Sequence, residues 1–224
     1  MKSKPHSLLL VTAIAGFVAI AAFSCLPAAA QAVKSKGPGI QVYVAHLHTM
    51  NEKTTGLQTA GEAKFTVDGN KLTISVEMHN APPGIAHWQH LHGFKDGKEA
   101  SCPTPASDAN HDGVIDINET EPASGTTMVP LDEDPAGMQI AKGTYPKASA
   151  DGGYQYREVI SLKALDQAFS KAFDGQHLDL SHRVVMVHGV PSSKNLPASV
   201  ASLGTIPAPV TLPIACGKIE RVAH

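Results

Sequence analysis

The chain has 224 residues, of which 42% are hydrophobic and 17% charged, and its formal net charge at pH 7 is -2. The charged residues form neither a basic patch nor a run of one sign, which argues against nucleic-acid binding and against a charged tail. The length is sufficient for one domain with a sizeable core.

The first 32 residues predict a secretory signal peptide. A basic tip with Lys2 and Lys4 precedes an apolar run over residues 8–23, and the sequence AQA at residues 30–32 offers a cleavage site. The apolar run is short for a membrane span, and no later stretch is apolar enough for one. The sequence therefore predicts an exported protein, periplasmic or extracellular, without a membrane span once the signal peptide is removed.

The leader also allows a second interpretation, in which Cys25 is the acylated residue of a lipoprotein, although the preceding residues 22–24 lack the usual leucine. Removal of residues 1–32 leaves 16 Lys and Arg against 20 Asp and Glu, a formal charge of -4. Residues 33–39 are then expected to be a flexible lead-in, and residues 40–224 to form one β domain.

Short strand patterns follow along the mature chain. Residues 40–48 alternate in polarity, and residues 61–79 contain two β-forming runs around Asp68-Gly69, which predicts a hairpin. Apolar residues at helical spacing predict one short helix over residues 162–173. The polar, Gly- and Pro-rich residues 95–126 predict a long loop. Further strands are predicted at residues 87–94, 126–131, 156–162, 182–190 and 210–222. This pattern indicates an all-β fold, an antiparallel β-sandwich or barrel.

Cysteine usage fits an exported chain. Once the leader is removed only Cys102 and Cys216 remain, and two cysteines in an oxidising compartment most simply form one disulfide. It would close a long loop, which in the chain-entropy model contributes about 4 to 5 kcal/mol of stability.

Three histidines lie close together in the sequence HWQHLHGF, residues 87–94. Successive side chains of a strand point to opposite faces, so His90 and His92 are expected to share one face while Leu91 occupies the other. Two imidazoles on one rigid strand are half of a copper or zinc site. A solvated strand face is the alternative.

A further histidine, His188, ends the apolar strand pattern RVVMVHG. A buried β-branched run that ends on histidine and glycine is a rigid support for a metal ligand. His188 therefore joins His90 and His92 as a candidate ligand.

Taken in order, these motifs resemble the copper-zinc superoxide dismutase family over roughly residues 40–222. HWQHLHGF is similar to the family's histidine that precedes a His-x-His pair by three residues, and Cys102 is similar to its loop cysteine. RVVMVHG resembles the family strand that begins with an arginine, here Arg183, and ends with a copper ligand, here His188. IACGKI resembles the family's ending around its last cysteine, here Cys216.

The resemblance implies a Greek-key β-sandwich or barrel of the superoxide dismutase type, with a disulfide between Cys102 and Cys216. It also implies a copper ion held by His90, His92 and His188.

Two parts of that family's machinery are missing from the sequence. Between Cys102 and Val129 this chain has only His111, where the family has a bridging histidine and further zinc ligands, so no complete zinc site is expected. Pro213 stands where the family has its substrate-guiding arginine. Any superoxide dismutation is therefore expected to be slow.

The first half of the chain is also similar to chordin-type extracellular domains. Their pattern G-x-A-x-F-x-V-x-G followed by His-x-His-Gly is similar to GEAKFTVDG and HLHG in this sequence. Those domains are not established enzymes, so this resemblance implies a binding or structural role.

The segment DANHDGVIDINE, residues 108–119, has the spacing of a twelve-residue calcium loop. Oxygen ligands recur at the required positions, a glycine at position 6 permits the sharp turn, and a final glutamate can bind through both oxygens. No long helix is expected to flank the segment and no second copy pairs with it, so a structural clamp is expected rather than a sensor. The candidate calcium ligands are Asp108, Asn110, Asp112, Val114 (through its carbonyl), Asp116 and Glu119.

Two further histidine interpretations stay open. His111 occupies position 4 of the calcium loop, which does not ligate the ion, so it is free to serve as a further copper ligand or to be an exposed loop residue. His46 and His48 repeat the His-x-His pattern and form a rival metal pair.

Three functions are compatible with these features. The first is an exported copper-dependent superoxide dismutase, with superoxide as substrate. The second is a non-catalytic module that holds copper for a copper-exchanging partner or has kept only calcium. The third is a structural cell-envelope domain whose histidines do not meet. The sequence leaves the choice between enzyme and binding module undecided.

Overall fold

The computed structural model describes residues 39–223. The predicted signal peptide at residues 1–32, Cys25 and nearly all of the lead-in at residues 33–39 lie outside the described residues. Within residues 39–223, no helix combines the length and the apolar character that crossing a membrane requires.

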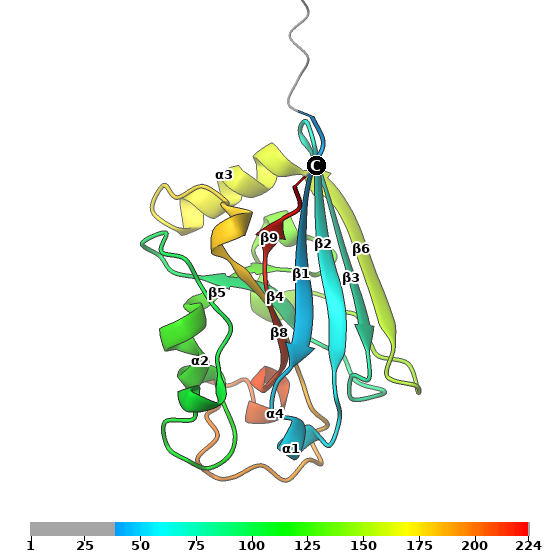
Figure 1. Cartoon of the computed structure of the whole chain (residues 1–224), viewed down its shortest axis with the longest axis vertical. Helices are drawn as coiled ribbons and strands as arrows, with labels where there is room; N and C mark the ends of the chain where they lie inside the picture. The colour runs from blue at the N-terminus through cyan, green and yellow to red at the C-terminus, as the bar shows by residue number, and fades with distance from the viewer. Residues whose placement is uncertain (1–38, 224) are drawn as a thin grey trace, which may run out of the picture. The chain divides into compact units, whose positions relative to one another are not determined.

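The described chain is built on antiparallel strands, as the sequence predicts (Figure 1). Along the sheet the strands follow the order β5-β4-β7-β8-β1-β2-β3-β6, and β9 pairs with β1. Strands that are consecutive in sequence, such as β3 and β4, lie far apart in this order, so the chain crosses between them. The strands are β1 (Gln41–Thr49), β2 (Ala60–Asp68), β3 (Lys71–His79), β4 (Gln89–Gly93), β5 (Thr126–Pro130), β6 (Tyr154–Ser161), β7 (Val184–His188), β8 (Pro213–Lys218) and β9 (Glu220–Arg221). The all-β fold class is confirmed.

Alternation of polarity decides which face of each strand is buried. In β1, Ala45 and Leu47 are buried whereas His46 and His48 are exposed. The turn between β2 and β3 comprises Gly69 and Asn70, one residue beyond the expected Asp68-Gly69, because Asp68 still pairs with Lys71. Gly69 adopts a φ of 58°, a left-handed conformation that glycine reaches without steric cost.

The main hydrophobic core lies on the inner face of the sheet and is covered in part by α3 (Leu162–Ala172). The helix contributes Leu165 and Phe169 to that core, followed by Phe173 just beyond its end. This is the helix that the sequence predicts over residues 162–173. Ser161 caps its first turn by accepting a hydrogen bond from the Ala164 N–H.

The structure contains further short helices, whereas the sequence predicts one, over residues 162–173. They are α1 (Glu52–Thr55), α2 (Ile117–Ser124) and α4 (Ala208–Thr211), together with 3-10 turns at Pro105–Ser107, Pro135–Gly137, Ile140–Lys142 and Leu180–His182. The expected strand over residues 210–222 is therefore shorter, because α4 occupies its first residues. Proline in the first turn of a helix is tolerated, since the N–H that it lacks would have no partner there.

The outer face of the sheet carries a second, smaller apolar cluster. On β7, Val185 and Val187 face the main core, whereas Val184 and Met186 belong to the outer cluster with Cys216 of β8. On β4, Leu91 faces the main core. Strand alternation then places His90 and His92 on the outer side.

Candidate metal centre

Three buried histidines meet on the outer side of β4 and β7. His90 and His92 come from β4, and His188 ends the neighbouring β7. Each ligand nitrogen lies within 4.8 Å of the other two. The ring centroids are 5.4 Å apart for His90 and His188, and 5.6 Å apart for His92 and His188. Exposure is at most 3% for each residue.

One nitrogen of each ring is buried without a hydrogen-bond partner: His90 Nδ1, His92 Nδ1 and His188 Nε2. A buried polar atom without a partner costs roughly 1 to 3 kcal/mol, so native structures rarely leave three such atoms close together. A metal ion bound by these nitrogens would satisfy all three.

The opposite nitrogens hold the rings in place. His188 Nδ1 lies 2.8 Å from the Thr211 carbonyl oxygen, so this nitrogen carries the proton and donates it. The Tyr145 hydroxyl donates to the Ile140 carbonyl at 2.8 Å. The Tyr145 oxygen is therefore left to accept from His90 Nε2 at 3.0 Å. His90 and His188 thus expose unprotonated nitrogens toward each other, an arrangement in which outer hydrogen bonds fix the tautomer of metal-binding histidines.

Burial keeps the three rings neutral at pH 7. Loss of hydration lowers the pKa of His92 to about 3 and that of His188 to about 4. The pKa of His90 is also lowered well below its usual value, by burial first and then by the neighbouring imidazoles. Neutral imidazole is the form that binds metal. The donor set fits a transition metal, because imidazole nitrogens suit copper, zinc, iron and nickel, whereas magnesium and calcium prefer oxygen.

A small hollow of about 20 Å³ lies beside the histidine group. Its walls are mostly apolar, with Trp88, Ile117, Ile140 and Leu203 next to His90 and His188, and none of its lining residues is a Lys or an Arg. A volume of this size accommodates about one water molecule. The hollow therefore admits only a very small ligand and offers it no positive side chain.

Position 213 lies beside the histidine group. Pro213 of β8 is the register partner of His188 at the point where the β7–β8 pairing shifts by one residue. Pro213 is itself buried. Proline, rather than the arginine that the resemblance implies at this position, thus lies next to a candidate ligand.

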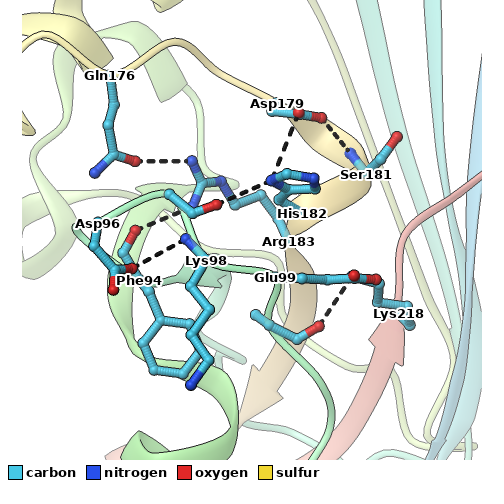
Figure 2. Close-up of polar contacts among 12 residues, drawn as sticks. Phe94, Asp96, Lys98, Glu99, Gln176, Asp179, Ser181, His182, Arg183 and Lys218 are labelled. Carbon is cyan, nitrogen blue, oxygen red and sulfur yellow. Dashed lines mark hydrogen bonds and ion pairs between the residues drawn. The ribbon is translucent and has the colours of Figure 1, made fainter.

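Arg183 connects the two ligand-bearing strands at the end away from His188 (Figure 2). Its side chain is 1% exposed and donates to the Phe94 carbonyl, just after β4, and to Gln176 Oε1. A Cβ at Gly93 would lie 2.5 Å from Arg183 Nη1, so only glycine leaves room for the guanidinium. Arg183 therefore contributes to the placement of β4 against β7 rather than to a substrate path.

His87 has a supporting role beside the histidine group. Its ring nitrogens lie 3.0 Å from the His188 carbonyl oxygen and 2.9 Å from that of Pro82. The ring is fully buried and stacks on Tyr154 at 5.6 Å. His87 is thus a core residue that holds the backbone of a candidate ligand.

Tyr145 was not found by sequence reasoning, although it positions His90 directly. It is buried and stacks on Trp88 at 5.3 Å. The segment that contains it has no strand or helix periodicity, so no local signal in the sequence identifies the residue.

Cys102 and Cys216 lie at disulfide distance, with an S–S separation of 1.99 Å, and are 114 residues apart in sequence. The bond joins the loop after β4 to β8. It fixes the start of the long segment that runs toward α2.

The calcium-loop segment adopts a tight turn held by its own carboxylates. Asp108 accepts the N–H groups of Asp112 and Gly113, and Glu119 Oε1 accepts those of Ala109 and Asn110.

The end of the same segment is tied to α2 and to the loop before α4. Asp116 caps α2 by accepting two N–H groups, and its second oxygen accepts the Ala201 N–H at 2.7 Å. The Ser199 hydroxyl donates to Asp112. Val114 is buried and packs in the main core.

His111 is not brought to the histidine group. It is exposed and has a positive φ of 59°, at the turn of the calcium-loop segment, residues 108–119, which is called the acidic loop below. Within residues 39–223, the convergent group of three or more His, Cys, Asp or Glu side chains consists of His90, His92 and His188 alone. His46 and His48 lie on β1 with exposed side chains, apart from that group.

Comparisons with known proteins give solved structures only. No protein-family model matches the chain, and no curated protein matches it. A SOD-like protein from Bacillus subtilis is 16% identical over 78% of this chain and 95% of that one, with a TM-score of 0.36. A double-substitution variant of a SOD-like protein from the same organism gives 19% identity, coverages of 78% and 94%, and a TM-score of 0.38. A single-substitution variant of a SOD-like protein from the same organism is 17% identical over 78% of this chain and 95% of that one, with a TM-score of 0.39.

Proposed function

We propose that this chain is an exported copper-binding protein of the superoxide dismutase type, and that any superoxide dismutation it performs is slow. The observation that carries the proposal is the group of three buried, unpartnered imidazole nitrogens of His90, His92 and His188. The order of the sequence motifs around these residues supports the family.

Copper is favoured over zinc by the donor set. Divalent copper binds a given nitrogen site more tightly than the other first-row metals do, including zinc. All three donors are neutral nitrogens, and no Asp or Glu joins them within the described part of the chain. Bound copper would supply one-electron chemistry between its two common oxidation states.

The surrounding residues favour binding over fast turnover. Dismutation converts two superoxide ions and two protons into dioxygen and hydrogen peroxide. An anionic substrate is drawn to a site by nearby positive charge, yet the hollow beside His90 and His188 is lined by apolar side chains and two threonines. Pro213 replaces the arginine of the family. These residues exclude water and limit the size of a ligand, but they do not attract an anion.

The acidic loop fits a structural calcium ion in this proposal. Asp108, Asn110, Asp112, Asp116 and Glu119 offer side-chain oxygens at the spacing that calcium requires, and Val114 offers its carbonyl. The loop leads directly into α2, and Ile117 of that helix lines the hollow. A calcium ion would therefore stabilise one wall of the metal centre. His111 is left out of the proposed copper ligands, because its side chain is exposed.

Copper titration of the metal-free protein from residue 33 tests the proposal. We expect one tightly bound copper ion whose spin-resonance spectrum shows nitrogen ligands. His90→Asn, His92→Asn or His188→Asn should each lower the copper affinity by about a hundredfold or more. Loss of a hydrogen-bond partner of a metal ligand alone already lowers metal affinity 10- to 100-fold. His79→Asn is the matched control, because His79 is exposed on β3. Tight copper binding by a His90→Ala, His92→Ala double variant would refute the assignment.

A superoxide assay on the copper-loaded protein separates the two remaining roles. Slow dismutation that disappears in the three histidine variants supports the enzyme. Tight copper binding without any dismutation supports a module that passes copper to a partner, the alternative that the uncharged hollow favours.

A further inference from the structure

A second pair of histidines lies on the outer face of β1. His46 and His48 are both exposed, while Ala45 before them and Leu47 between them are buried. Two residues on one strand face are separated by roughly 6.6 Å along the strand. At this separation, two imidazoles can turn toward a common ion.

The two histidines line a surface hollow of about 290 Å³ together with Glu220 of β9. Glu220 is the register partner of Val44, which lies two residues before His46 on the same face. Cross-strand diagonal neighbours are within reach of long side chains. The hollow thus has two imidazoles and one carboxylate in its wall. Their ligand atoms are not gathered within 4.8 Å as those of His90, His92 and His188 are, so these exposed side chains must turn to reach one ion.

Lys218 also lines the hollow, but its charge is engaged elsewhere. Its ammonium lies 3.0 Å from Glu99 Oε1 and donates to the Ala100 carbonyl at 2.9 Å (Figure 2). The cation is therefore held by groups on the loop after β4. Its repulsion of a second cation in the hollow is correspondingly reduced.

Glu62 approaches His46 from the other side. It is the register partner of His46 on β2, and its Oε2 lies 3.6 Å from His46 Nδ1. A carboxylate beside one imidazole nitrogen orients the ring and favours metal binding through the other. This leaves His46 Nε2 for an ion in the hollow.

We propose that His46, His48 and Glu220 form a second, solvent-exposed site for a divalent transition-metal ion, with Glu62 orienting His46. Two imidazoles and one carboxylate suit zinc and divalent copper. The ligands are exposed and must be ordered on binding. The site is therefore weaker than the buried one and exchanges its ion faster.

The two sites are separate but lie on one row of the sheet. His48 is the register partner of Cys216, Cys216 of Met186, and Met186 of His90. Three strand spacings of 4.7–4.9 Å place His48 and His90 roughly 14 Å apart. No ligand is shared, so the second site does not depend on the first.

Calorimetric titration with zinc, and then with divalent copper, tests the second site. We expect the metal-free parent to bind two ions, one tightly and one with much lower affinity. A His46→Asn, His48→Asn double variant should keep the tight ion and lose the weak one. Glu220→Gln should weaken binding of the second ion about tenfold, which is within the range of affinity losses on mutation of residues that support a metal site. His79→Asn is a matched control, because His79 is also exposed and its Nε2 lies 3.7 Å from Oε1 of Glu77 on the same strand.

The outcome can be separated from that of the first site. A His90→Asn, His188→Asn variant should lose the tight ion and keep the weak one. Zinc should shift the NMR signals of the His46 and His48 ring protons in that variant, but not that of His79. Equal weak binding by the parent and the His46→Asn, His48→Asn variant, or equal shifts at His79, would overturn the proposal.

Discussion

The buried histidine group and the acidic loop are both candidate ion sites, but the fold prepares them in opposite ways. The nitrogens of His90, His92 and His188 that face each other have no partner within residues 39–223. The carboxylates of the acidic loop already accept backbone N–H groups, as Asp108 does from Asp112 and Gly113. The first site is held by strands and outer hydrogen bonds, and the second is held largely by its own ligands.

This difference bears on the effect of removing an ion. Without a metal, the histidine group keeps its strand positions, because Tyr145 and Thr211 hold the rings from the other side. The acidic loop without calcium keeps several carboxylates close together, and their repulsion works against the turn. Metal loss should therefore leave β4 and β7 intact and loosen residues 108–119.

The largest expected effect is a loss of stability of the metal-free protein on mild acidification. In the unfolded chain these imidazoles bind protons near pH 6.5, whereas in the folded chain burial lowers the pKa of His92 to about 3 and of His188 to about 4. Between these pH values the unfolded state binds more protons than the folded state. The contribution of these imidazoles to the free energy of unfolding is therefore fully present above about pH 6.5 and is lost as the pH decreases toward 4. Each such imidazole contributes up to about 1.4 kcal/mol per pH unit.

Denaturant unfolding of the metal-free protein from pH 7.5 to 4.5 measures this slope. His188→Asn should reduce it, and His79→Asn should not. A slope that is unchanged in His188→Asn would show that the histidine group is not held neutral by burial.

Calcium should have the next largest effect. Binding to the folded chain alone stabilises it by about 2.7 kcal/mol at a hundred times the dissociation constant. We expect a higher melting temperature in calcium than in chelator, and faster proteolysis of residues 103–126 in chelator. Asp108→Ala and Glu119→Ala should abolish the difference between the two conditions.

Glu121→Ala is the control for the calcium experiment, because Glu121 is an exposed acid of α2 outside the loop. Its calcium response should equal that of the parent. If Asp108→Ala and Glu119→Ala also respond like the parent, the loop is a turn stabilised by backbone hydrogen bonds only.

The smallest effect is expected from Tyr145→Phe. The substitution removes the acceptor of His90 Nε2, so the proton is no longer fixed on that nitrogen and copper affinity should fall by about tenfold. The spin-resonance spectrum should change as well. Tyr156→Phe is the matched control, since this buried hydroxyl donates to the Asp132 carbonyl. An equal loss of affinity in both variants would mean that Tyr145 acts through general stability alone.

Local periodicity was sufficient to predict much of the fold. The alternation around Leu91 predicted that one side of β4 faces the core and that His90 and His92 share the other, and helical spacing predicted α3. Both features depend on near neighbours in sequence. For the same reason, the hairpin turn could be located to within one residue: it was expected at Asp68-Gly69 and lies at Gly69-Asn70.

Features made by distant segments could not be predicted. Tyr145 reaches His90 because the chain folds back across 55 residues, and nothing in its local sequence marks it. The Asp116 and Glu119 capping box that begins α2 was present in the sequence. The sequence predicts calcium ligands at the same residues, because one acidic pattern can serve both purposes.

The bond between Cys102 and Cys216 also determines the fate of a chain cut by a protease. His90 and His92 precede the first cysteine, whereas His188 and the acidic loop lie between the two. A single cut in the acidic loop or in the loop before α4 yields two fragments that remain covalently joined. A nicked molecule in an oxidising compartment therefore keeps all three histidines on one covalent assembly, and it separates only when a reductant is present.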